Sequence, residues 1–89
     1  MPYVYENERP ELLTDAGQRL FLKIRDHAAA LLNAAGAFQM GAVMTLASGT
    51  SWQMMAAVDR LVELGELREV TGADIPGQDR VFVKPRSWR

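Results

Sequence analysis

The residue types that most often carry catalysis are sparse in this chain. His27 is the single histidine, and no cysteine is present. The acids Glu6 and Glu8 lie in a proline-containing stretch with no rigid element to position them, so we do not expect them to act as a general acid and base. No spacing in the sequence suggests a nucleophile with its base, a phosphate-binding glycine loop or a metal site. We therefore predict a protein that is not an enzyme and that uses no cofactor and no metal.

Basic side chains near the C-terminus offer a different chemistry, the neutralisation of phosphate. Residues 76–89 contain four basic residues and one acidic residue, although the whole chain has a net charge of −1. The basic residues are Arg80, Lys84, Arg86 and Arg89. Phosphate contacts supply much of the affinity of proteins for nucleic acid, so this segment is a candidate nucleic-acid contact. Its alternative role is to keep the chain in solution.

A long amphipathic helix is the clearest element that the sequence predicts. Thr14 and Asp15 are typical of a helix start, because the hydroxyl can cap a free amide and the carboxylate suits the positive end of the helix dipole. Apolar residues then recur at intervals of three and four as far as Ala35, and Gly36 suits a helix stop. We predict a helix over residues 14–35.

The first 13 residues contain two prolines and have no helical period. We therefore predict an arm over residues 1–13, in which Val4 and its flanking tyrosines could form a short strand. Leu22 falls off the apolar stripe of the helix 14–35 and adds to the apolar surface of the arm. From this surface we predict a homodimer that forms through the arm and the helix 14–35.

Two shorter helices and a hairpin follow. Apolar spacing predicts one helix from Met40 to Ala47 and another over residues 51–64, separated by a short turn that contains Gly49, as a helix-turn-helix requires. After Gly65 the pattern changes to short β-type runs with a turn-rich stretch between them, which predicts a hairpin over residues 66–84. The fold class is therefore α+β, mainly α, with one domain over residues 14–85 and a tail over residues 86–89.

Residues 43–67 read VMTLASGTSWQMMAAVDRLVELGEL. This pattern of an aliphatic pair, a turn with Ser and Gly, a polar helix start and an ending of the form LxxLGxL resembles winged helix-turn-helix repressors. The resemblance implies three helices with a C-terminal β-hairpin wing. It also implies that the helix 51–64 enters the major groove of double-stranded DNA while the hairpin 66–84 contacts the backbone.

The resemblance carries over to particular positions of this chain. Gln53 could pair with adenine, and Arg60 could reach a guanine or a phosphate. The implied DNA contacts are Thr50, Ser51, Trp52, Gln53, Ala56, Arg60, Gln78, Arg80, Lys84 and Arg86. We therefore expect a small DNA-binding transcriptional regulator.

Two alternatives remain open, because the first two turns of the implied recognition helix hold no arginine or lysine. In the first, the chain is a winged-helix module that docks to a protein through Trp52, its methionines and the acidic first strand of the hairpin. In the second, it is an accessory subunit of a larger assembly. The N-terminus lacks the basic and apolar regions of a signal peptide, and the apolar stretch 28–38 is too short to span a bilayer, so we expect a cytoplasmic protein without a membrane partner.

Overall fold

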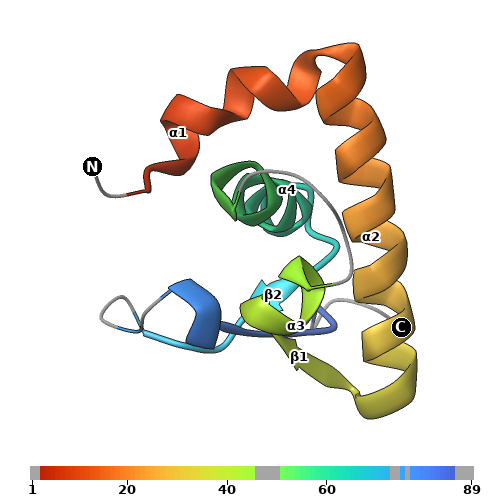
Figure 1. Cartoon of the computed structure of the whole chain (residues 1–89). Helices are drawn as coiled ribbons and strands as arrows, with labels where there is room; N and C mark the ends of the chain where they lie inside the picture. Colours follow the sequence, from red (N-terminus) through yellow and green to blue (C-terminus); the bar gives the residue numbers. More distant parts are fainter. Residues whose placement is uncertain (1–2, 46–50, 73–74, 76, 86–89) are drawn as a thin grey trace.

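The computed structural model describes residues 3–45, 51–72, 75 and 77–85. The elements are, in order, α1 (Tyr5–Glu8), the 3₁₀ helix η1 (Arg9–Leu13), α2 (Asp15–Ala35), β1 (Ala37–Gln39), α3 (Met40–Met44), α4 (Ser51–Glu63), β2 (Arg68–Glu69), the 3₁₀ helix η2 (Gly77–Asp79) and β3 (Val81–Val83). Helix α4 lies in the middle, with α2 along one side, α1 and η1 over another, and α3 and the strands beneath it (Figure 1). The fold is α+β and mainly helical, as predicted.

Helix α2 begins and ends as its sequence predicts. The Thr14 hydroxyl accepts a hydrogen bond from the Gly17 amide at 3.0 Å, which caps the first turn. Gly36 ends the helix in the left-handed conformation, with φ of 79°, which favours glycine. The inner face of the helix buries Ile24, Ala28 and Leu32. No helix among the described residues is long and apolar enough to cross a membrane.

The two helices of the predicted helix-turn-helix are both present, but the first is short. Helix α3 ends at Met44, whereas the predicted helix ends at Ala47. Ala47 and the predicted turn around Gly49 lie outside the described residues. Helix α4 ends at Glu63, one residue before the predicted end. Its five consecutive residues from Met54 to Val58 are all buried, so neighbouring elements surround the helix here instead of leaving one face open.

A small antiparallel sheet closes the core. The predicted hairpin is present as β2 and β3, and β1 adds a third strand on the other side of β3, in the order β1-β3-β2. Phe82 pairs with Phe38 across β1 and β3, and their rings stack with centroids 5.5 Å apart. Strand β1 was not predicted, because three residues between a helix stop and the next helix are too few to show an alternating pattern.

The predicted arm over residues 1–13 is helical over most of the part that the structure describes. Residues 5–13 form α1 and η1, and Val4 is exposed instead of lying in a strand. Pro10 is compatible with η1 because it occupies the first turn, where its missing amide hydrogen costs little. Leu12 is buried with 3% of its surface exposed, so the segment 3–13 is part of the core.

Candidate functional site

One side of α4 is the natural candidate site, because the winged-helix resemblance expects it to meet DNA. Trp52, Ala56, Asp59 and Glu63 are spaced three and four residues apart, so they share this side of the helix. The segment 3–13 arches over α4 (Figure 1) and contacts Trp52, Asp59 and Glu63. Ala56 lies between these contacts and is fully buried. The segment 3–13 thus covers Ala56, which the sequence predicts to face a DNA groove.

Tyr3 holds one end of the segment 3–13 on α4. Its hydroxyl donates a hydrogen bond to the Asp59 Oδ2 at 2.5 Å, and its ring meets Trp52 edge to face with centroids 6.5 Å apart. Burial and the hydrogen bond to Asp59 raise the pKa of Tyr3 well above its usual value. The phenol therefore stays protonated and keeps donating to the carboxylate.

Glu63 is the second anchor of the segment 3–13, and three side chains donate to it. Its Oε1 accepts hydrogen bonds from the Tyr5 hydroxyl at 2.9 Å, from the Arg9 Nε at 3.2 Å and from the Arg60 Nη1 at 2.6 Å. The hydrogen bonds from Arg60 and Tyr5, with that from Arg9, lower the pKa of Glu63 to about 2. Two guanidinium groups thus share one carboxylate, which leaves one positive charge in excess in this group.

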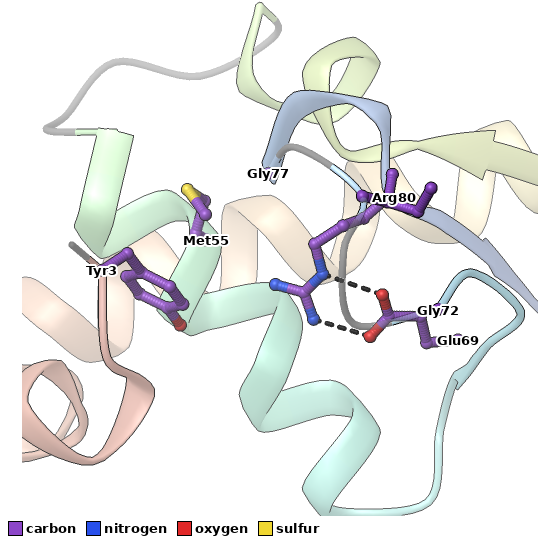
Figure 2. Close-up of a pocket in the computed structure, with 7 residues that line it drawn as sticks. Tyr3, Met55, Glu69, Gly72, Gly77 and Arg80 are labelled. Carbon is purple, nitrogen blue, oxygen red and sulfur yellow. Dashed lines mark hydrogen bonds and ion pairs between the residues drawn. The ribbon is translucent and has the colours of Figure 1, made fainter.

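Arg80 is held inside the molecule instead of projecting from a wing. Its Nη2 lies 2.6 Å from the Asp59 Oδ1 on α4 and 2.8 Å from the Glu69 Oε1 on β2. Its Nε also donates to the Glu69 Oε2 at 2.9 Å, so the pair is bidentate (Figure 2). The guanidinium lies 5.3 Å from the centre of the Phe82 ring, and 16% of the side chain is exposed. The structure thus pairs the charge of Arg80 within the chain, whereas the sequence predicts a contact between this residue and the DNA backbone.

A cavity of about 350 Å³ lies beside Arg80, between the segment 3–13 and the hairpin. Figure 2 shows Tyr3 and Met55 on one side of it and Arg80 with Glu69 on the other. Gly77 borders the cavity, and a Cβ there would lie 2.7 Å from the Met55 Cε. The charged groups that line the cavity, Arg80 and Glu69, are bonded to each other.

The remaining implied DNA contacts are scattered. Ser51, Trp52, Gln78 and Lys84 are exposed. Gln53 is half-buried beside η1 and the start of α2, and Arg60 is half-buried and bonded to Glu63. Thr50 and Arg86 lie outside the described residues. The structure thus presents four of the ten implied contacts as exposed side chains, and one of these, Lys84, carries a charge.

An apolar depression of about 240 Å³ lies where η1, α2 and the end of α4 meet. Leu13, Leu22 and Leu64 line it with 57%, 45% and 47% of their surfaces exposed. Its other lining residues are Leu12, Gln18, Phe21 and Arg60. The sequence signal for it was the position of Leu22 off the apolar stripe of α2. Because Leu13 and Leu64 each lie at the end of an element, periodicity could not assign them to the same surface.

The candidate metal ligands are dispersed in the described part of the chain. No group of three histidine, cysteine, aspartate or glutamate side chains there could hold a metal ion. His27 is half-buried on α2.

No model of a known protein family, no curated protein and no solved structure matches the chain.

Proposed function

We propose that the chain is a non-catalytic module of the winged-helix type that binds a partner protein rather than DNA. The observation that carries the proposal is the engagement of the α4 side within the chain. The segment 3–13 covers this side, and Arg80, the basic residue nearest to it on the hairpin, is paired with Asp59 and Glu69. DNA binding depends on cations that can replace counterions at phosphates, and these guanidinium donors are already used.

The winged-helix type is supported by the order of the elements. A long helix α2 is followed by the two helices α3 and α4 and then by the antiparallel hairpin of β2 and β3. This is the order of three helices and a wing that the resemblance of residues 43–67 implies. The contact between Arg80 and Asp59 ties the hairpin to α4, so hairpin and helix form one unit.

The apolar depression is the surface that we assign to the partner. Three exposed leucines in one concave site are more than the scattered apolar residues of an ordinary surface. Arg60 lies at its edge, in the group where Arg60 and Arg9 share Glu63 and leave one positive charge in excess. The matching partner is an amphipathic helix that places apolar side chains in the depression and an acidic side chain beside Arg60.

The test of the docking site uses a synthetic helical peptide with a leucine face and flanking glutamates. Nitrogen–proton NMR spectra of the labelled chain should show shifts at Leu13, Leu22 and Leu64 as the peptide is added. Leu22→Asp should abolish these shifts, whereas Val70→Asp, a matched change at an exposed apolar residue on the hairpin, should leave them intact. Shifts that survive Leu22→Asp, or that occur elsewhere, would remove the basis for this docking site.

The second candidate function is DNA binding by a regulator of transcription. Ser51 and Trp52 favour it, because both are exposed in the first turn of α4. Recognition helices often read bases with their first residues. Exposed Gln78 and Lys84 could then contact the backbone. A mobility-shift assay with random-sequence duplex DNA at low salt separates the two candidates. Protein docking predicts no shift, whereas a shift that weakens with Lys84→Ala and with added salt would favour DNA.

A further inference from the structure

A single residue joins the segment 3–13 to the long helix α2. Thr14 has an extended backbone, with φ of −76° and ψ of 162°, between the last residue of η1 and the first residue of α2. Its hydroxyl donates to the Glu11 carbonyl at 2.7 Å and accepts from the Gly17 amide at 3.0 Å. The chain therefore changes direction at one position, and this turn folds the segment 3–13 back over α4 of the same chain.

Gly17 makes this sharp turn possible. A Cβ at position 17 would collide with the Glu11 carbonyl oxygen and would lie 2.7 Å from the Leu12 Cα. Both of these are backbone atoms, so they cannot move aside as the end of a flexible side chain can. In a straight helix the same Cβ would point away from the backbone. Alanine in place of glycine would then stabilise the helix by about 1 kcal/mol.

The segment 3–13 depends on α4 for its structure. Its helices have four and five residues, which is too short for a helix to be stable in water alone. Leu12 is buried in the core, and Tyr3, Tyr5 and Arg9 bond to Asp59 and Glu63 on α4. Every one of these contacts is with side chains that a second copy of the chain also presents.

We propose that a second copy of this chain is a binding partner, through exchange of the segment 3–13. When Thr14 becomes helical, η1 and α2 join into one helix that begins at Pro10, a residue that is favoured in the first turn. The segment then leaves its own α4 and packs on α4 of the second copy, where it makes the same contacts. Such an exchange costs little because the contacts with α4 are made again in the second copy and the losses are confined to the turn itself, including the two hydrogen bonds of Thr14. Short hinges favour such an exchange. The depression proposed for the partner protein is not needed for this exchange.

The test is Gly17→Ala, with the molar mass measured by light scattering at one fixed protein concentration. We expect the variant to shift from monomer to dimer relative to the parent chain, because alanine opposes the turn and favours the straight helix. The control is Gly72→Ala, since a Cβ there meets nothing within 4 Å, and its mass should equal that of the parent. A Gly17→Ala chain that is folded by circular dichroism and monomeric would overturn the proposal.

Cross-linking distinguishes an exchanged dimer from two folded chains that merely lie side by side. The chain has no cysteine, so Tyr5→Cys with Glu63→Cys supplies the only two thiols for a bifunctional maleimide. In the Gly17→Ala background we expect covalent dimers, whereas the parent background should give mainly links within one chain. Links within one chain in the Gly17→Ala dimer would overturn the proposal.

A second variant serves if Gly17→Ala does not fold. Thr14→Ala removes both hydrogen bonds of the turn without adding atoms, and a monomeric Thr14→Ala chain would equally overturn the proposal.

Discussion

Arg80, the residue before β3, and Asp59 on α4 are joined by an ion pair with a distance of 2.6 Å between Nη2 and Oδ1, and each side chain is about 15% exposed. The pair links the hairpin to the central helix. Glu69 on β2 completes the arrangement by bonding to the same guanidinium. One arginine thus connects three elements, and its two acidic partners would repel each other without it.

The first prediction concerns the removal of this arginine. Arg80→Met should lower the free energy of unfolding by about 2 to 3 kcal/mol, because Asp59 and Glu69 would remain partly buried without a countercharge. The loss is somewhat smaller than for a fully buried ion pair, because these side chains are partly exposed. Urea denaturation measures the change. Arg25→Met is the matched control, since Arg25 pairs with Asp26 on the surface at 3.7 Å and should cost less than about 1 kcal/mol. Equal losses in the two variants would contradict the structural role of Arg80.

The second prediction concerns acid. The pKa of Glu63 is lowered from 4.5 to about 2 in the folded chain, so its bonds stabilise the fold fully above about pH 4.5 and are lost as the pH falls towards 2. The pKa of Glu69 is also lowered, by its bonds to Arg80, and acts in the same direction. The unfolding free energy of Glu63→Gln should therefore fall less between about pH 4.5 and 2 than that of the parent chain. Denaturation at several pH values measures the difference. Glu66→Gln, at the neighbouring turn, is the control and should leave the pH profile unchanged.

The third prediction concerns alkali. Burial and hydrogen bonds to Asp59 and Glu63 raise the pKa values of Tyr3 and Tyr5 above 10. A raised pKa stabilises the fold fully below the unfolded value and loses this effect as the pH rises. The chain has two tyrosines, so the ultraviolet absorbance of tyrosinate reports on these side chains alone. We expect tyrosinate to form above pH 10, together with loss of structure in the segment 3–13. Titration of both tyrosines near pH 10 with this segment intact would contradict the bonds to α4.

The fourth prediction concerns the sheet. Phe82 is fully buried and stacks on Phe38, so Phe82→Ala should cost about 3 to 5 kcal/mol of unfolding free energy. Val83→Ala, at the next residue, where the side chain is half-buried, should cost about 1 kcal/mol. Thermal or urea denaturation compares the two. A loss from Val83→Ala as large as that from Phe82→Ala would mean that the core does not centre on Phe82.

The elements that sequence predicted best are those with a local signal. Thr14 and Gly36 marked the ends of α2 correctly, because capping and the left-handed conformation depend on the residue itself. The β-type run at residues 81–83 likewise identified β3. Such signals need no knowledge of distant contacts.

The parts that sequence missed depend on partners far along the chain. Tyr3 and Asp59 are 56 positions apart, and nothing local indicates that they bond. Without this contact, residues 3–13 resemble an arm, and Ala56 resembles an exposed position on a recognition helix. The pairing of Arg80 was missed for the same reason, since a basic residue near a turn suggests an exposed charge until Asp59 and Glu69 are known to lie beside it.

Gly17 also has an evolutionary consequence. A Cβ at this position collides with the backbone at Glu11 and Leu12. Any selection that keeps the segment 3–13 folded back on its own α4 therefore also keeps glycine at position 17. A descendant that replaces Gly17 with a larger residue is expected to keep α4 covered only by exchange between chains. The identity of this one residue would then distinguish lineages that act as single chains from lineages that act in pairs.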